Sequence, residues 1–123
     1  MEDFWKKYDK KEYIGSCSYR NVYKGKNKLT SEYVAIKEIN KMRIKTNKVI
    51  LNMIKIMEKL KSENSVLLIE TFETSDCYYI ISEYCYMSLE EYMNKRNNCL
   101  SIEEIKELLL DLNKGLKKIV III

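Results

Sequence analysis

The sequence contains no histidine and no proline, and it has only three glycines. The absence of histidine excludes histidine-based metal sites, catalytic triads and proton shuttles. Without proline, and with so little glycine, no stretch of the chain has the composition of a linker between domains. The four cysteines contain no C-x-x-C pair, so neither a zinc site nor a thioredoxin-like site has support: Cys17, Cys77, Cys85 and Cys99.

Long apolar runs and concentrated basic stretches are also missing. The apolar stretch at 119–123 is too short to span a bilayer, and residues 1–11 have the acids Glu2, Asp3 and Asp9 and no apolar run, unlike a signal peptide. The formal net charge of +4 is spread along the chain rather than gathered into a basic stripe. We therefore expect no membrane and no nucleic acid as partner. The scattered cysteines indicate reduced thiols and a cytoplasmic location.

The residues that are present predict one folded α+β unit. The chain has 123 residues, of which 46% are hydrophobic and 33% charged, enough for one modest core. Residues 8–25 are rich in Tyr, Ile and Val and have Gly15, Ser16 and Ser18 in the middle, which predicts a β-hairpin. A strand is predicted over 33–39, with Val34 and Ile36 on one face and Ala35 and Lys37 on the other.

The pattern then changes to helical spacing. A helix is predicted over 46–61 and ends at 63–65, because apolar residues recur every three or four positions: Val49, Ile50, Met53, Ile54, Met57 and Leu60. Strands over 66–71 and 78–82 follow, joined by a turn at 74–76. A short helix is predicted over 89–95. A longer one is predicted from Ser101 to about Ile119, begun by a capping box of Ser101 and Glu104.

Three segments together resemble the protein kinase domain. Residues 14–25, I-G-S-C-S-Y-R-N-V-Y-K-G, are similar to the glycine-rich loop G-x-G-x-x-G-x-V, and residues 34–37 match the V-A-I-K strand. Residues 79–85, Y-I-I-S-E-Y-C, resemble the fifth strand and the hinge. Taken singly, each segment also fits a purely structural interpretation. The first could be an ordinary hairpin, the second a strand with an exposed lysine, and the third a buried strand that enters a loop. Their order and spacing favour the kinase resemblance over a chance match by an unrelated α+β domain.

The resemblance implies a fold and a nucleotide site. The expected fold is a kinase-like N-lobe with hinge at 8–85, a five-stranded antiparallel sheet with one main helix, followed at 86–123 by two helices of an incomplete C-lobe. The implied ligand is ATP, with Mg²⁺ bound only through the ATP. The resemblance implies that Lys37 contacts the phosphates and that Gly15 and Val22 belong to the covering loop. It places Ile14, Val22 and Ala35 around the adenine. Glu83 and Cys85 would make backbone contacts at the hinge, and Ser82 would be the small gate residue.

Several positions depart from the family pattern. Cys17 and Arg20 replace the second and third glycines of the loop. The glutamate that pairs with the strand lysine in active kinases aligns with Met53, whereas an alternative alignment that uses Glu58 spoils the apolar stripe. Ser88 stands near the place where the family often has an acid for the ribose.

The sequence ends before the segments that carry phosphate-transfer chemistry in the family. No H-R-D catalytic loop and no D-F-G segment occur in the 123 residues, so we expect no catalytic residue and no protein metal ligand in this chain. Two functions stay open: the ATP-binding portion of a Ser/Thr-type kinase domain, inactive as this truncated chain, or a pseudokinase-like interaction module. The last helix has an apolar face that we expect to bind a protein partner and to make the chain a poorly soluble or marginal monomer.

Overall fold

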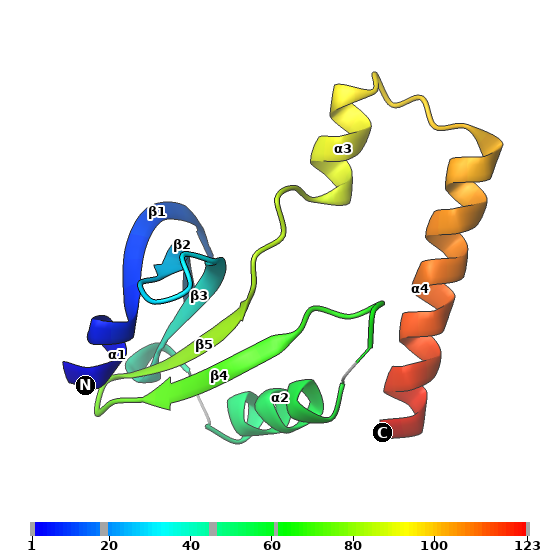
Figure 1. Cartoon of the computed structure of the whole chain (residues 1–123). Coiled ribbons are helices and arrows are strands. Elements are labelled where there is room, and N and C mark those ends of the chain that lie inside the picture. Colours follow the sequence, from blue (N-terminus) through cyan, green and yellow to red (C-terminus); the bar gives the residue numbers. More distant parts are fainter. Residues whose placement is uncertain (1, 18–19, 45–46, 61, 123) are drawn as a thin grey trace.

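A computed structural model describes residues 2–17, 20–44, 47–60 and 62–122 (Figure 1). The helices are α1 (Glu2–Lys7), the short 3₁₀ helix η1 (Lys41–Arg43), α2 (Asn47–Lys59), α3 (Leu89–Lys95) and α4 (Ile102–Ile122). The strands are β1 (Tyr8–Cys17), β2 (Arg20–Asn27), β3 (Tyr33–Asn40), β4 (Leu68–Glu73) and β5 (Cys77–Glu83). They form one antiparallel sheet in the order β1-β2-β3-β5-β4, which confirms the predicted fold class.

Two local predictions differ from the structure, and one short helix was missed. Gly15 and Ser16 were expected in a turn but lie within β1, opposite Val22 and Asn21, while the turn residue Ser18 lies outside the described residues. The strand expected at 66–71 begins two residues later. Near its start the backbone amide of Leu67 donates a 2.8 Å hydrogen bond to the Glu83 carboxylate, and the pairing with β5 shifts after Leu68. Helix α1 was not predicted.

The alternation of side chains divides the sheet into two different faces. Val34 and Ile36 of β3 face the first, as predicted, and are buried there with Ile81 of β5. We call this side the aromatic face, because most of its other members are aromatic: Phe4, Tyr8 and Tyr79, with Trp5, Tyr23 and Phe72 packed against them. On the opposite face, which we call the cleft face, Ile39, Tyr78 and Ile80 of the sheet pack against Ile50 of α2.

Helix α1 closes the aromatic face. The ring of Phe4, 2% exposed, lies 4.5 Å from the ring of Phe72 and 5.0 Å from that of Tyr79, measured between centroids. Trp5 adds an edge contact to Tyr79. Aromatic pairs of this kind stabilise beyond the area they bury. The first residues of the chain therefore belong to the core of the sheet.

Tyr8 anchors the start of β1 to β4. Its ring is 1% exposed and its hydroxyl donates a hydrogen bond to the carboxylate of Glu70, which also forms an ion pair with Lys7 at 2.6 Å. Burial opposes ionisation of Glu70, but the hydrogen bonds from Lys7 and Tyr8 prevail and hold the pKa of that carboxyl below its ordinary value. Burial and the same hydrogen bond raise the pKa of Tyr8.

We expect Tyr8→Phe to lower the free energy of unfolding by about 1 kcal/mol, because one hydrogen bond to a carboxylate is lost while the ring stays buried. Urea denaturation measures this change. Tyr86→Phe is the matched control, since Tyr86 is 77% exposed. Equal midpoints for the two variants would show that the Tyr8 hydroxyl contributes nothing to stability.

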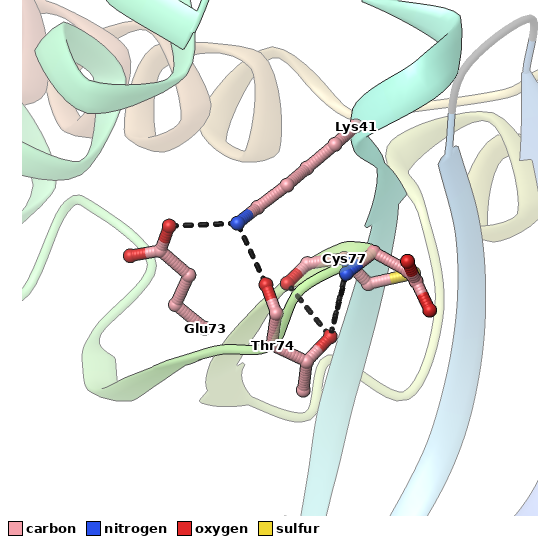
Figure 2. A network of polar contacts seen from close by, with 5 residues as sticks. Lys41, Glu73, Thr74 and Cys77 are labelled. Carbon is pink, nitrogen blue, oxygen red and sulfur yellow. Dashed lines mark hydrogen bonds and ion pairs between the residues drawn. The ribbon is translucent and has the colours of Figure 1, made fainter.

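Lys41 fastens the turn between β4 and β5 to the end of β3 (Figure 2). Its ammonium donates to the Glu73 carboxylate at 2.7 Å and to the carbonyl oxygen of Thr74 at 2.6 Å. The Thr74 hydroxyl accepts from the amide of Cys77 at 3.0 Å, which closes the turn. The predicted turn at 74–76 is therefore confirmed and is held by both backbone and side-chain contacts.

Helices α3 and α4 extend away from the sheet, and α4 runs back toward the end of α2 (Figure 1). Arg96, the residue that caps the end of α3, forms a 2.5 Å ion pair with Glu104 of α4. The Ser101 hydroxyl caps α4 by accepting from the amide of Glu104 at 3.1 Å. The Glu104 side chain of the expected capping box bonds to Arg96 and Tyr92 instead.

Near its C-terminal half, α4 meets the loop after α2. The buried Gly115 packs so closely there that a Cβ atom would lie 2.9 Å from the carbonyl oxygen of Asn64. The Asn64 side chain also donates to the carboxylate of Asp111. A neighbouring stripe of α4 stays exposed, with its apolar side chains open to solvent: Ile102, Ile105, Leu109, Leu112 and Leu116.

Candidate nucleotide-binding cleft

A cleft of about 480 Å³ lies on the cleft face, where β5 leads into α3. Seven of the eight residues predicted for the nucleotide site line it: Ile14, Val22, Ala35, Lys37, Ser82, Glu83 and Cys85. The sequence motifs, which are up to 71 residues apart (85 − 14), thus meet at one place. The sheet register explains the convergence, because Val22 pairs with Lys37 and Ala35 pairs with Ser82.

Gly15, the eighth predicted residue, is not among the residues that line the cleft. It pairs with Val22 at an irregular step of the ladder between β1 and β2. A Cβ atom at Gly15 would have nothing within 4 Å, so internal packing does not require glycine there. Cys17 follows as the last residue of β1 and pairs with Arg20, so the two glycine-replacing residues lie opposite each other at the end of the hairpin.

Lys37 is the cation inside the cleft. Burial lowers the pKa of its ammonium below the ordinary value of 10.5, the positive charge of Arg20 lowers it further, and Cys85 opposes the shift. Among the described residues no carboxylate forms an ion pair with Lys37. The ammonium is thus held in a partly desolvated, electropositive place, which suits an anionic ligand.

Helix α2 does not bring an acid to Lys37 among its described residues. Met53 packs against the apolar cluster of the cleft face that contains Ile39 and Ile80. Glu58 is exposed and lies beside Leu60 and Leu67 in a separate depression. The observed packing of α2 therefore agrees with the alignment that puts Met53, rather than Glu58, at the position of the family's glutamate.

The hinge segment, residues 83–85, borders the cleft. The backbone amide of Glu83 donates to the carbonyl oxygen of Leu67 at 3.0 Å, while the Glu83 carboxylate accepts from the Leu67 amide at 2.8 Å. Because its amide is engaged, a ligand contact through the backbone of Glu83 would use its carbonyl oxygen. Ser82, the predicted gate residue, is 1% exposed and is a small side chain at the back of the cleft.

Sequence reasoning missed about half of the lining residues. They come from β1, from the loop before β4, from the hinge and the segment after it, and from α3: Glu12, Tyr13, Val66, Tyr84, Tyr86, Met87 and Glu91. Ser88, which the sequence placed near the ribose position, also lines the cleft. Ser88 caps α3, since its hydroxyl accepts a 3.1 Å hydrogen bond from the amide of Glu91. A serine three residues before a glutamate was the available signal for this helix start.

The cleft suits a nucleotide by its chemistry. Ile14, Val22 and Ala35 supply apolar surface for a flat base, and Lys37 supplies a cation for a phosphate. Within the described part of the chain, no three Cys, Asp or Glu side chains are grouped so that they could hold a metal ion. None of the described helices is long and apolar enough to cross a membrane.

A five-stranded antiparallel sheet with a lysine-bearing cleft beside a hinge is the arrangement of a kinase N-lobe, and the comparisons with known proteins agree. Residues 8–120 match the protein kinase domain family, so the chain belongs to that family. Cyclin-dependent kinase 14 of Xenopus tropicalis is 34% identical over 113 residues, and that of Homo sapiens is 33% identical. These alignments cover 91% of this chain but 27% and 24% of the two relatives, so the chain spans about a quarter of their length.

Proposed function

We propose that this chain is the ATP-binding portion of a protein kinase domain of the Ser/Thr type, whose family activity transfers the γ-phosphate of ATP to a protein hydroxyl. The observation that carries the proposal is the position of Lys37. Its ammonium lines the same cleft as Val22, Ala35 and the hinge residue Cys85. Similarity to cyclin-dependent kinase 14 supports the same class.

Each of the predicted site residues then has a physical role. Ile14, Val22 and Ala35 enclose the adenine ring through apolar contact, while Glu83 and Cys85 offer backbone groups to its polar edge. Lys37 neutralises charge on the α- and β-phosphates, and Gly15 lets the covering backbone approach them. Mg²⁺ would be bound through the nucleotide and would offset the negative charge of its phosphates. Ser82 leaves the back of the adenine pocket open.

Phosphate transfer by the 123-residue chain itself is not expected. Its sequence has no histidine and contains neither an H-R-D catalytic loop nor a D-F-G segment. The aspartate that orients the substrate hydroxyl and the residues that hold magnesium are therefore not among these residues. We place the protein in the cytoplasm, which fits the free thiols of Cys77, Cys85 and Cys99.

Isothermal titration of the purified chain with Mg-ATP tests the proposal. One saturable site, with competition by adenosine, is the expected result, because the base contributes most of the apolar contact. A folded chain that shows no saturable binding up to millimolar Mg-ATP would overturn the ATP-binding assignment. Circular dichroism on the same sample establishes that the chain is folded.

A second function, a non-catalytic interaction module, is favoured by one observation on α4. Leu109, Leu112 and Leu116 are between 57% and 60% exposed and lie on one stripe of the helix. Exposed apolar stripes of this kind favour association with a protein partner. Pull-down with the parent chain and with a Leu109→Lys, Leu116→Lys variant tests it, and equal capture of partners by both would contradict the module.

Restoring the two residues that depart from the kinase pattern separates these functions. We expect Cys17→Gly with Met53→Glu to raise the affinity for Mg-ATP by about 10-fold, since a flexible loop approaches the phosphates and a carboxylate can orient Lys37. Titration calorimetry on the double and single variants measures the change. An unchanged affinity in a folded double variant would favour the interaction module.

A further inference from the structure

A second pocket, of about 560 Å³, lies at the end of the sheet where Val34 of β3 pairs with Glu83 of β5. We call it the rear pocket, because Val34 belongs to the aromatic face, on the side of the sheet opposite the nucleotide cleft. Its other walls come from the loop before β3, the start of β3, the region of β4 and the residues after β5: Ser31, Glu32, Tyr33, Leu67, Ile69, Tyr84 and Tyr86.

Three tyrosines give the rear pocket aromatic walls. The ring of Tyr84 lies 6.2 Å from that of Tyr33 and 5.3 Å from that of Tyr86, measured between centroids, with interplanar angles of 55° and 80°. Rings that meet at such angles turn their faces in different directions instead of stacking on one another. Because the face of an aromatic ring attracts positive charge, walls of this kind recognise organic cations.

One cation of the chain already lies against two of these rings. The Lys24 ammonium is 4.2 Å from the ring centroid of Tyr33 and 4.8 Å from that of Tyr84. Both distances are within the range of about 6 Å over which a ring attracts a cation. Lys24 does not line the rear pocket itself, so its ammonium leaves that space open to a ligand.

The charge of the rear pocket is also suited to a cation. Glu32 and Glu83 line it, whereas among the described residues no lysine or arginine does. The Glu83 carboxylate is held in place by the 2.8 Å hydrogen bond from the Leu67 amide. Leu67 and Ile69 add apolar surface. An unmodified ammonium is strongly hydrated and would lose water against these apolar walls, but a quaternary ammonium has no N–H groups to satisfy.

We propose that the rear pocket binds a quaternary ammonium group. The methyl groups of the ligand contact the rings of Tyr33, Tyr84 and Tyr86, and the carboxylates of Glu32 and Glu83 offset its charge. The inference goes beyond ATP binding and does not depend on it. A small molecule such as choline and a trimethylated lysine side chain of a peptide present this same chemical group, so both are used as probes.

Titration of the isotope-labelled chain, followed by the NMR shifts of its backbone amides, tests the proposal. Choline is compared with 3,3-dimethylbutan-1-ol, the neutral isostere in which carbon replaces the nitrogen. Choline should give saturable shifts around the rear pocket, and the isostere should bind about 5- to 30-fold more weakly, because it has no charge for two or more rings to attract. Equal binding of the two compounds, or no saturable shift with choline, would overturn the proposal.

Tyr33 locates the binding, because it lines the rear pocket but not the nucleotide cleft. Tyr33→Leu should weaken choline binding by about 2- to 5-fold, the contribution of one partly exposed ring, while Tyr33→Phe keeps the ring and the affinity. Lys24→Met should strengthen binding by a similar factor of about 2 to 5, since a positive charge beside two of the rings is removed. A Tyr33→Leu variant that binds choline as the parent does would contradict the site.

Glu32→Gln tests the carboxylate and should weaken choline binding. Its matched control is Glu90→Gln, which makes the same change in net charge at an exposed residue of α3 outside the rear pocket and should bind as the parent does. Equal affinities for these two variants would overturn the role of Glu32. Circular dichroism of every variant excludes unfolding as the cause of a lost interaction.

A short peptide that contains trimethyllysine distinguishes the two sources of the ligand. Tighter binding of this peptide than of choline assigns the rear pocket to a modified lysine side chain, whereas choline binding that is equal or tighter assigns it to a small molecule. The same peptide with unmodified lysine is the control. If it binds as tightly as the trimethylated peptide, the pocket does not select a quaternary ammonium and the proposal is overturned.

Discussion

Lys37→Met is expected to lower the affinity of the chain for Mg-ATP by about 10- to 100-fold, the range that one charge-assisted hydrogen bond to a phosphate supports. Methionine keeps the length and the apolar stem of the lysine side chain, so the wall of the cleft stays filled. The effect should fall on nucleotides that have phosphates. Adenosine, which lacks them, should bind the parent and the variant equally well.

Lys55→Met provides the control for this substitution. Lys55 is exposed on α2 and does not line the cleft, so its replacement makes the same change in net charge without touching the ligand. Titration calorimetry on the three proteins separates a local contact from a general charge effect. An equal loss of affinity in both variants would contradict a phosphate contact by Lys37.

The pH dependence of binding gives a second readout for the same residue. Burial and Arg20 lower the pKa of Lys37 below 10.5, so its folded-state ammonium loses its proton at a lower pH than that of an ordinary lysine. As the pH is raised, ATP affinity should therefore begin to fall before the pH reaches 10.5. Stability has the opposite sign: the unfolded chain binds this proton more tightly, so the Lys37 contribution to stability rises with pH across that window.

Ile81→Ala is expected to have the largest effect on stability, a loss of about 2 to 5 kcal/mol in the free energy of unfolding. Ile81 is fully buried on the aromatic face, where it pairs with Ile36 of the neighbouring strand. Three carbon atoms are removed from a site between two strands and α1, and a cavity remains because paired strands cannot close the gap. Urea denaturation measures the loss from the midpoint.

Leu29→Ala serves as the control for Ile81→Ala. Leu29 is 91% exposed in the loop between β2 and β3, so its truncation should change stability by less than about 0.5 kcal/mol. Because the Ile81 side chain lies on the face opposite the cleft, the residual folded Ile81→Ala protein should bind Mg-ATP normally. A variant as stable as the parent would show that the aromatic face is not the core of this sheet.

The strands were predictable because they depend on local patterns, whereas the site residues were implied by the resemblance to protein kinases. Alternation along 33–39 placed Val34 and Ile36 on one face and Ala35 and Lys37 on the other, and the structure confirms both sides. The helix over 89–95 was predicted with its observed bounds. These features follow from the two-residue period of strands and from capping residues, which are visible in any single sequence.

The features that were missed depend on residues far apart in the chain. Helix α1 has only Phe4 and Trp5 as apolar residues, too few for a periodic signal, and it is held by contact with Phe72 and Tyr79. Helices this short form mainly through tertiary packing. Glu91 likewise lines the cleft from α3, an element to which the sequence motifs assigned no part of the site.

Thermal unfolding with and without Mg-ATP tests the central claim, a nucleotide cleft built around Lys37, most directly. A ligand that binds only the folded state stabilises it by about 2.7 kcal/mol at 100 times its dissociation constant. We predict a clear rise in the melting temperature of the parent and of Lys55→Met, and a much smaller rise for Lys37→Met. A folded parent whose melting temperature does not change with Mg-ATP, or a Lys37→Met variant that rises as much as the parent, would contradict the claim.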